Sequence, residues 1–444
     1  MTLSESLEKL KDIPQHELAY HLGLYKTYPY GNFAVIKLSG SVINNPDSLE
    51  RIADNLSILQ GLGLNPIITY GWGQKLTDLL KANGVETKFQ NGVRITDDTV
   101  MLHLRGVDRN SMISLEYALR KKAVNYADFL PAERLITAVQ DMQLAKIGGT
   151  ENGKIKSINV TPLLTLANKG VIPILSPLGR GHNGNEYNLN SAEVLVHLAQ
   201  EVNTHKVIMV TNTKGILDKD GNVIKQIVLQ RDYEPLIKWV VSEGAEKNLE
   251  EAKKYLYGRN DGVDHSVQIV GPDNLCKELF THKGDGTFIR KGYAINKATD
   301  EFIKSGKAKT IIEDAWGKHL VDGFFESIGP KSTMYVEEQQ KGLAIVEDTT
   351  MGLYLSILAV KSGCQKTGVG SDLMHAIDST DKGKLFLRTK ADNPIKEYYG
   401  SIFEGKQEIT VKGVPFVGFW QGFSFGEIPA ILKYMQNKPL NFKY

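Results

Sequence analysis

The apolar positions of residues 1–290 alternate between short buried runs and helically spaced patterns. FAVIKLSGSVI (33–43) is an apolar run that enters a Gly/Ser turn, and NPIITYGWG (65–73) repeats this arrangement. Helices are expected at NPDSLERIADNLSILQGLGL, with Asn or Asp near the N-cap, and at KLTDLLKANG. The alternation continues through GVIPILSP, NSAEVLVHLAQEV and KVIMVTNT. It predicts βαβ units, and therefore an α/β domain with a mostly parallel sheet between helical layers.

The first 27 residues precede the first expected strand. Their apolar positions have helical spacing, and Pro14 interrupts the pattern. We therefore predict two short helices and assign 1–27 to an N-terminal helical segment. The α/β domain then covers 28–290.

The pattern changes after Ala294. A helix at KATDEFIKSG is followed by strands at STMYVEE, GLAIVED and YLSILAV, a glycine loop, a helix, and a strand at GKLFLRT. More strands and a C-terminal helix complete the chain. This order predicts an α+β domain over 295–444, joined by a short linker within 288–300.

Composition excludes several classes of function. The 444 residues are 41% apolar and 23% charged, with a net charge of +2 and no basic run, so we expect no nucleic-acid partner. No apolar stretch is long enough to cross a membrane, and the N-terminus lacks the apolar core of a signal peptide. Two cysteines far apart, Cys276 and Cys364, argue against a disulfide framework and favour a cytoplasmic location. The scattered histidines predict no metal site.

A glycine loop in the second domain carries the strongest chemical signal. An apolar strand ends at Val360, and Gln365-x-x-Gly368-x-Gly370 then opens a helix near Ser371. Glycines let a ligand approach the backbone, and the free N–H groups of a helix start favour an anion such as a pyrophosphate. A tight turn without a ligand stays open as an alternative. A Rossmann dinucleotide site fits poorly, because the third glycine is absent.

The wording around this loop resembles a known family. Q-x-x-G-x-G after a strand resembles the coenzyme A loop of GNAT acyltransferases. YLSILAV, LFLRTKADNPIKEYYG and GFWQGF resemble the C-terminal domain of N-acetylglutamate synthases of the vertebrate-like and bifunctional synthase/kinase type. IKLSG, NGVRIT, NLNSAE, GILDKDG and KELFTHKGDGTFIRKG resemble the amino-acid kinase domain of the same family. The resemblance therefore implies an amino-acid-kinase-like domain followed by a GNAT domain.

The family's roles carry over to matching positions. Coenzyme A is expected against Leu358, Ala359, Val360, Gln365, Lys366, Gly368, Gly370 and Ser371. Arg388 is expected to grip a glutamate carboxylate, with Asn393 and Lys390 in the same pocket. Tyr399 is expected to donate a proton to the leaving thiolate. Without the motif, Arg388 and Tyr399 would be interpreted as a surface ion pair and a packed aromatic residue.

One departure affects the acyltransferase chemistry. The family's YLDKFAV has a lysine where this chain has Ile357 and an aspartate where it has Ser356, and Lys390 replaces an arginine. An isoleucine can neither pair with a carboxylate nor move a proton. Either another cation, Lys361 or Lys390, takes the place of the lysine, or the acceptor or the acyl group differs, or the activity is reduced. We expect acyl transfer to persist with altered substrate contacts, such as those of a succinyl group.

The first domain departs further from an active kinase. Phosphoryl transfer needs fixed cations and an acidic residue that organises them. Lys37 and Gly40 are kept, but Ser39 breaks the glycine pair, Trp72 between Gly71 and Gly73 is expected to crowd the phosphate turn, and Ala192 replaces the organising aspartate. Glu193 is expected to point elsewhere. Asn248 aligns with the second lysine, and a shift by one position would place Lys247 there.

We therefore expect a domain without kinase activity, and ATP and Mg²⁺ as ligands only if that activity survives. Arg94 and Asn188 match positions that contact acetylglutamate in active kinases. Together with Lys37, Gly40, Gly71 and Gly73, they form the expected ligand site of this domain.

The predicted function is synthesis of N-acetylglutamate from acetyl-CoA and L-glutamate at the entry to arginine biosynthesis. An acetylglutamate kinase with a vestigial second domain and a regulatory pseudoenzyme stay open as alternatives. The resemblance also implies L-arginine as an effector bound with help from residues 4–27, and a homo-oligomer, either a dimer or a tetramer.

Overall fold

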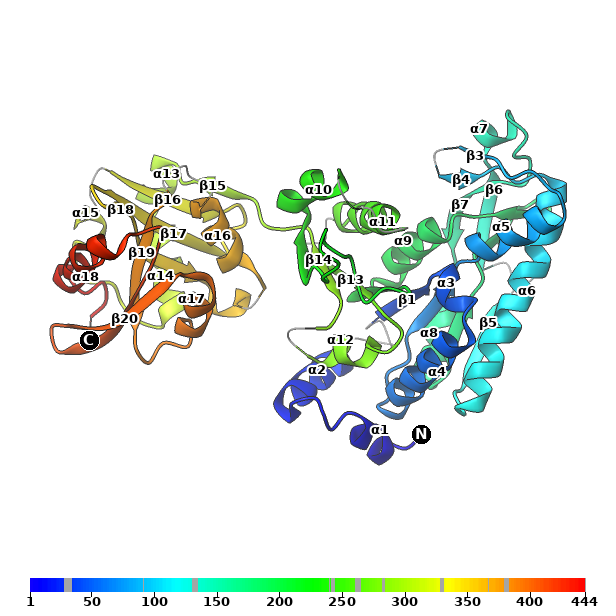
Figure 1. Ribbon diagram of the computed structural model, residues 1–444, viewed down its shortest axis with the longest axis horizontal. Coiled ribbons are helices and arrows are strands. Elements are labelled where there is room, and N and C mark those ends of the chain that lie inside the picture. The colour runs from blue at the N-terminus through cyan, green and yellow to red at the C-terminus, as the bar shows by residue number, and fades with distance from the viewer. Residues whose placement is uncertain are drawn as a thin grey trace. The chain divides into compact units, whose positions relative to one another are not determined.

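The chain forms two compact units, Met1–Lys291 and Gly292–Tyr444. The computed structural model describes residues 1–27, 34–90, 92–129, 135–238, 240, 244–259, 265–281, 284–327, 331–365, 367–378 and 383–443. The division lies close to the expected boundary, and the N-terminal helical segment belongs to the first unit (Figure 1).

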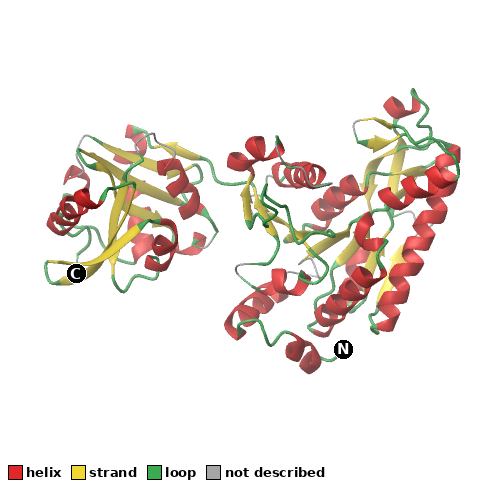
Figure 2. Cartoon of the chain, in the orientation of Figure 1, coloured by secondary structure: helices red, strands yellow, loops and turns green. Residues whose placement is uncertain are grey.

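The first unit is built on an eight-stranded sheet in the order β12-β14-β13-β11-β1-β2-β8-β5. Neighbouring strands pair in parallel except β13 and β14. Its strands are β1 (Ala34–Leu38), β2 (Ile67–Tyr70), β5 (Tyr126–Phe129), β8 (Ile172–Leu175), β11 (Lys206–Val210), β12 (Gln226–Val228), β13 (Ser266–Val270) and β14 (Thr287–Arg290). Helices cover both faces of this sheet, which confirms the predicted three-layer α/β architecture (Figure 2).

Two small sheets complete the strands of this unit. They are formed by β3 (Phe89–Gln90) with β4 (Val93–Arg94), and by β10 (Glu186–Asn188), β9 (Leu178–Arg180), β6 (Ile136–Gln140) and β7 (Gly153–Ile158). The helices are α1 (Leu3–Lys9), α2 (Gln15–Thr27), α3 (Gly40–Ile43), α4 (Pro46–Gly61), α5 (Gly73–Ala82), α6 (Asp98–Lys121), α7 (Met142–Ala145), α8 (Thr161–Asn168), α9 (Ser191–Val202), α10 (Leu229–Ile237), α11 (Ala245–Tyr257) and α12 (Leu275–Phe280). None of the helices in these described ranges, or in those of the second unit, combines the length and apolar character that crossing a bilayer requires.

Helix α4 shows how local sequence sets an element boundary. The Asn45 side chain accepts a hydrogen bond from the Ser48 N–H at 3.1 Å, and Pro46 occupies the first turn, where its missing N–H costs nothing. Leu49, Ile52 and Leu56 then recur at helical spacing and are buried against the sheet. The expected Asn cap is therefore confirmed.

The second unit contains a seven-stranded sheet in the order β15-β16-β17-β18-β19-β21-β20. Its strands are β15 (Ile295–Lys297), β16 (Ser332–Glu337), β17 (Gly342–Thr349), β18 (Gly352–Val360), β19 (Leu385–Lys390), β20 (Gly405–Val411) and β21 (Val414–Gln421). Its helices are α13 (Asp300–Lys304), α14 (Lys307–Trp316), α15 (Phe324–Ser327), α16 (Val369–Asp378), α17 (Lys396–Ile402) and α18 (Ile428–Asn437). All neighbours are antiparallel except β18 and β19, which α16 connects. The predicted α+β domain is confirmed, although three helices, α13, α14 and α15, occupy the region where one was expected before β16.

A buried carboxyl group in the first unit gives a testable pH dependence. Asp108 on α6 is 4% exposed and accepts hydrogen bonds from Tyr70 (2.7 Å) and Ser176 (3.0 Å). Burial raises the pKa of Asp108 to about 6, although these two hydrogen bonds oppose the change. The folded state therefore holds this proton more tightly than the unfolded state, and the folded state loses stability as the pH rises from about 4 to about 6.

Replacing Asp108 by asparagine is expected to remove this loss. Relative to the wild type, the free energy of unfolding of Asp108→Asn should increase by about 2–3 kcal/mol between pH 4 and pH 7, because each pH unit between the two pKa values corresponds to about 1.4 kcal/mol. Urea titrations of both proteins at the two pH values measure the difference. A difference that does not change with pH would contradict the raised pKa.

Candidate active site and ligand site

A cleft opens in the second unit where two parallel strands diverge. Strands β18 and β19 pair only over Leu353–Leu355 and Leu385–Leu387. Against β17, the register of β18 shifts so that Ser356 is an extra, bulged residue between Leu355 and Ile357. Beyond Leu355 and Leu387, the backbones of β18 and β19 no longer pair with each other. The bulge therefore turns the centre of the sheet into an open wedge.

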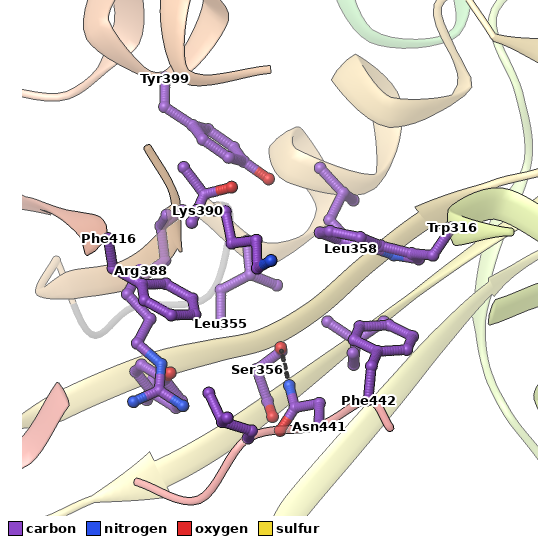
Figure 3. Close-up of a pocket in the computed structure, with 15 residues that line it drawn as sticks. Trp316, Leu355, Ser356, Leu358, Arg388, Lys390, Tyr399, Phe416, Asn441 and Phe442 are labelled. Carbon is purple, nitrogen blue, oxygen red and sulfur yellow. Dashed lines mark hydrogen bonds between the residues drawn. The ribbon is translucent and has the colours of Figure 1, made fainter. Parts of the chain in front are cut away.

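The wedge is lined by residues from several elements, with about 590 Å³ of empty space counted out to its open mouth. The lining residues are Trp316, Tyr354, Leu355, Ser356, Ile357, Leu358, Leu387, Arg388, Thr389, Lys390, Tyr399, Phe416, Leu440, Asn441 and Phe442. Most of these residues are apolar or aromatic, and polar side chains on β18, β19 and the last described residues complete the lining. Figure 3 shows the Tyr399 hydroxyl and the Lys390 ammonium pointing toward the middle of the cleft.

Tyr399 is placed by α17 and by aromatic packing. Its ring is 5% exposed and contacts Phe419 at a centroid distance of 5.7 Å and Phe403 at 6.0 Å. Burial raises the pKa of Tyr399, and the neighbouring Tyr398 adds to this effect. The phenol therefore stays protonated across the neutral range and can act as a donor.

Arg388 lines the cleft, but its guanidinium is bonded to backbone carbonyls. It donates to Met435, to Lys438 at 2.9 Å and to Pro439 at 2.6 Å. Figure 3 shows this group turned away from Tyr399 and Lys390. The expected grip on a glutamate carboxylate would require Arg388 to give up these bonds.

Asn393 does not line the cleft. Its side-chain oxygen accepts a hydrogen bond from the Ile395 N–H at 3.2 Å, directly before α17 begins. This is the arrangement of an Asx turn. Asn393 therefore helps to place the helix that carries Tyr399.

Ile357 packs into the apolar layer beneath the sheet. Its side chain is 2% exposed and belongs to a cluster with Leu343, Ile345 and Ala359. An ammonium group there would lie in apolar surroundings, which is costly without a partner. Of the two cations expected to replace the family's lysine, Lys390 lines the cleft and Lys361 is not among the lining residues.

The glycine loop forms a helix start at the end of β18. Helix α16 begins at Val369, two residues before the expected Ser371. Gly368 has φ +102°, a conformation that favours glycine. A Cβ atom on Gly370 would lie 3.6 Å from the Val360 side chain, which is an ordinary van der Waals contact. Gln365 donates from its side chain to the Val360 carbonyl at 3.4 Å. Lys366 lies outside the described residues.

The first turn of α16 is also tied to the beginning of its own unit. Asp372 is 7% exposed, and its carboxylate accepts a hydrogen bond from the Tyr293 N–H at 2.8 Å. This bond joins the segment before β15 to the helix of the glycine loop. The sequence offered no signal for it.

The first unit brings its glycine turns together at the carboxyl ends of β1 and β2. A Cβ atom on Gly40 would lie 3.4 Å from the Gly71 carbonyl oxygen and from the Gly73 nitrogen. Trp72 is 5% exposed and packs against Tyr70 in the core, with ring centroids 5.7 Å apart. The expectation that its indole crowds the turn was wrong, because the ring is buried in the core beside the turn.

Lys37 is engaged by an acidic residue from another helix. Its ammonium lies 2.8 Å from the Glu251 carboxylate of α11, and both side chains are buried. Lys247 is close enough for Lys37 to lower its pKa, although burial is the larger cause, while Glu251 and Glu193 act in the opposite direction. Lys247 therefore belongs to this group of charges, and the expected direction of the Glu193 side chain stays a prediction.

Arg94 and Asn188 are joined through Thr96. The Asn188 amide donates to the Thr96 hydroxyl at 2.8 Å, and Asn152 bonds both the Thr96 N–H and the Arg94 carbonyl. Arg94 is 7% exposed and donates to Gly73 and Thr77, and burial lowers its pKa. Within the ranges described above, its Nη1 atom is buried without a hydrogen-bond partner. The expected ligand residues of this domain are thus brought to one region.

Sequence comparison gives this two-unit chain a family. Residues 32–269 match the model of the amino acid kinase family, over more than half of the chain. The chain belongs to the amino acid kinase family. Residues 294–438 of this family member match the N-acetyltransferase domain described as NAT of N-acetylglutamate synthase.

Several relatives match this amino acid kinase family member over most of its length, across both units. An acetylglutamate kinase of Xylella fastidiosa strain Temecula1 is 30% identical over 393 residues, which cover 88% of this chain and 90% of the relative. An acetylglutamate kinase of Xanthomonas campestris is 28% identical over 91% of this chain and 93% of the relative. The mitochondrial protein arg-6 of Neurospora crassa is 28% identical over 94% of this chain but only 48% of its own length.

Solved structures share the two-unit fold. The N-acetylglutamate synthase of Neisseria gonorrhoeae, complexed with coenzyme A and N-acetyl-glutamate, has a TM-score of 0.67 and 20% identity over 92% of this chain and 98% of that one. The same synthase complexed with coenzyme A and L-arginine has a TM-score of 0.59 and 20% identity. The predicted amino-acid-kinase-like domain followed by a GNAT-type domain is confirmed.

Several cleft residues were not predicted from the sequence. Trp316, Asn441 and Phe442 are distant from the glycine loop in the chain and carry no motif. Within the part of the chain that the structure describes, no group of three or more His, Cys, Asp or Glu side chains is arranged to hold a metal ion.

Proposed function

We propose that the chain is an N-acetylglutamate synthase, an acyl-CoA-dependent N-acetyltransferase that uses acetyl-CoA and L-glutamate in arginine biosynthesis. The observation that carries this proposal is the wedge between β18 and β19, into which Tyr399 points. The match to the NAT domain of N-acetylglutamate synthase supports it.

The residues of the second unit suit a coenzyme A thioester. The N–H groups at the start of α16, together with Gly368, Gly370 and Ser371, suit a pyrophosphate. Beyond the bulge, Leu358, Ala359 and Val360 leave a backbone edge of β18 that an extended chain with amide groups can pair with. We propose that Gln365 orders the loop between these two regions.

Acyl transfer then needs few protein groups. The neutral amine of glutamate attacks the thioester carbonyl carbon, the C–S bond breaks, and the thiolate takes a proton while the new amide nitrogen loses one. We propose that Tyr399 supplies the proton to the sulfur and that Lys390 pairs with a carboxylate of the acceptor.

A thiol-release assay tests this function. Purified protein is given L-glutamate with either acetyl-CoA or succinyl-CoA, and free thiol is measured over time. Turnover with acetyl-CoA is the expected result, and a preference for succinyl-CoA would change the acyl group but not the reaction class. Coenzyme A binding without turnover from either donor would contradict the proposal.

We also propose that L-arginine is an effector bound by the first unit. Tyr25 of α2 donates a hydrogen bond to the Leu279 carbonyl of α12, so the N-terminal segment expected to help bind arginine packs on α12. Glu278, the preceding residue, is 5% exposed and accepts from the N–H groups of Asp285 (2.7 Å) and Gly286 (2.8 Å). Glu278 is therefore a fixed, buried carboxylate of the kind that pairs with a guanidinium.

Millimolar L-arginine is expected to raise the thermal midpoint by a few degrees, because a ligand that binds only the folded state stabilises it. Differential scanning fluorimetry with L-lysine and L-citrulline as matched controls measures the effect. Lysine keeps the charge without the planar fork, and citrulline keeps the shape without the charge. Equal shifts with all three compounds would contradict a guanidinium site.

A homo-oligomer and a cytoplasmic location stay predictions. One face of α6 exposes Leu102 (67%), Ile113 (52%) and Tyr117 (73%) at helical spacing, and we propose that a second copy of the chain covers it. Tyr117→Glu is expected to lower the mass measured by light scattering. An unchanged mass would contradict this interface.

A further inference from the structure

The last residues of the chain complete the wall of the cleft. We call Lys438–Lys443, which follow α18, the C-terminal tail. Leu440, Asn441 and Phe442 of this tail line the cleft. Leu320 and Phe442 form an antiparallel bridge, and the Val321 N–H donates to the Asn441 carbonyl at 3.1 Å. The C-terminal tail is therefore held in an extended conformation against the residues that follow α14.

Arg388 holds the other end of the tail. Three of its five N–H donors bond the carbonyls of Met435, Lys438 and Pro439, where α18 ends and the tail begins. These carbonyls lack helical partners, so a guanidinium there satisfies acceptors that a helix end leaves open. The Phe416 ring lies 5.1 Å from the guanidinium carbon and covers it.

Asn441 reaches the bulge at which β18 and β19 separate. Its Nδ2 atom donates to the Ser356 carbonyl at 3.1 Å (Figure 3). Its tail neighbours in the cleft, Leu440 and Phe442, are apolar, and the Phe442 ring packs on Trp316 at 5.0 Å. Asn441 is thus the polar side chain that the tail contributes to the cleft.

We propose that Asn441 is a specificity-determining residue that contacts the acceptor amino acid, and that Arg388 is a positioning residue that acts through the tail. This inference rests on the proposed acyltransferase function. A carboxamide offers a donor for a carboxylate and an acceptor for an amine, the two groups that an amino-acid acceptor presents. A small change in the tail moves this carboxamide relative to Tyr399 and Lys390, which face the same cleft.

The test compares two acceptors, L-glutamate and L-glutamine, in steady-state kinetics. The variants are Asn441→Ala, Arg388→Gln, Arg388→Lys and the double variant Asn441→Ala/Arg388→Gln. Lys433→Gln, an exposed charge removal on α18 away from the cleft, is the matched control. Thermal unfolding of each variant reports whether it is folded.

Asn441→Ala is expected to raise the KM for glutamate about tenfold and to leave the KM for acyl-CoA unchanged. Arg388→Gln and Arg388→Lys are expected to raise the KM for glutamate and glutamine by the same factor. Glutamine has only two N–H donors for the three carbonyls, and lysine lacks the planar fork that spreads its donors over them. Adding Asn441→Ala to Arg388→Gln should raise the KM no further, since both changes act through one element.

Three outcomes would overturn the inference. An unchanged KM in Asn441→Ala would remove its contact with the acceptor. Arg388→Gln could instead lose activity with glutamate but not with glutamine, while Arg388→Lys, which keeps the positive charge, restores the activity with glutamate. That result would assign Arg388 a direct contact with the acceptor carboxylate. Additive effects in the double variant would separate Arg388 from the tail. Should Arg388→Gln fail to fold, Asn441→Ala still decides the first point, and an unchanged KM for both acceptors in Arg388→Lys would contradict the positioning role of Arg388.

The same assay separates this inference from the proposed function. A wild-type protein without turnover would overturn the function and the inference together. An active wild type whose variants match the Lys433→Gln control would overturn the inference alone.

Discussion

Replacing Tyr399 by phenylalanine is expected to lower kcat by about 10²–10³-fold. Proton transfer by a positioned side chain contributes about 10²–10⁴-fold to catalysis, and Tyr399 presents its hydroxyl to the cleft from a buried ring. The loss should appear in kcat and in kcat/KM alike, because the interaction with the leaving sulfur develops in the transition state.

The neighbouring tyrosine supplies the control. Tyr398 does not line the cleft, and its hydroxyl interacts with Ser371 at the start of α16. Tyr398→Phe is expected to leave kcat within about twofold of the wild type, within the range of a lost neutral hydrogen bond. Stopped thiol-release assays over pH 6–9 measure both variants. Equal losses in kcat from the two substitutions would contradict a specific proton donor at Tyr399.

The pH profile provides a second check on Tyr399. Burial raises the pKa of this phenol above its ordinary value, so Tyr399 remains protonated throughout the assay range. The activity should therefore rise with pH as the glutamate amine loses its proton, and no falling limb from Tyr399 should appear below pH 9. A falling limb between pH 7 and 9 that disappears in Tyr399→Phe would contradict the raised pKa.

Removing the carboxylate of Glu251 is expected to destabilise the first unit by about 3–5 kcal/mol. Glu251→Ala leaves the Lys37 ammonium, which is 9% exposed, without its counter-charge, and an unpaired buried charge is costly. Replacing both partners, as in Lys37→Met/Glu251→Leu, should recover most of this loss, because the paired and the apolar versions of a buried site differ little in stability.

Chemical denaturation of the single and double variants measures this pair. The control is Glu250→Ala, which removes an exposed carboxylate from the same helix. A loss in Glu251→Ala no larger than in Glu250→Ala would contradict a buried, paired charge.

The ion pair between Lys37 and Glu251 also bears on the expected absence of kinase activity. The Lys37 ammonium is neutralised by the Glu251 carboxylate, so it brings no excess positive charge to this region. A triphosphate needs an excess of positive charge to stabilise its transferring group, and Ala192 supplies no carboxylate to hold a cation. We expect no ATP-dependent phosphorylation of acetylglutamate by the purified chain.

The local periodicity of apolar residues predicted the helices and strands well. It could not predict contacts between side chains that are far apart in the sequence. The βαβ alternation and the glycine loop each depend on residues near one another, so β1, α4, β18 and α16 could be predicted within a few positions. The pairing of Lys37 with Glu251 could not be predicted in this way, because Glu251 lies on α11, 214 positions later in the chain.

The cleft shows the same limit. The resemblance singled out Tyr399, which lines the cleft, but it also assigned Arg388 a substrate contact. The structure shows that the Arg388 guanidinium donates hydrogen bonds to the carbonyls at the end of α18. The sequence around position 388 could not predict these acceptors, because they lie about 50 positions later in the chain. The bulge at Ser356 is likewise a property of pairing with β17, and an apolar run alone does not predict it.

The hydrogen bond from the Tyr293 N–H to Asp372 sets a lower limit on where the acyltransferase unit can be cut out for separate expression. A fragment that begins at β15 would lack this donor and leave the Asp372 carboxylate, in the first turn of the glycine-loop helix, without that partner. A fragment that begins at Gly292 keeps it.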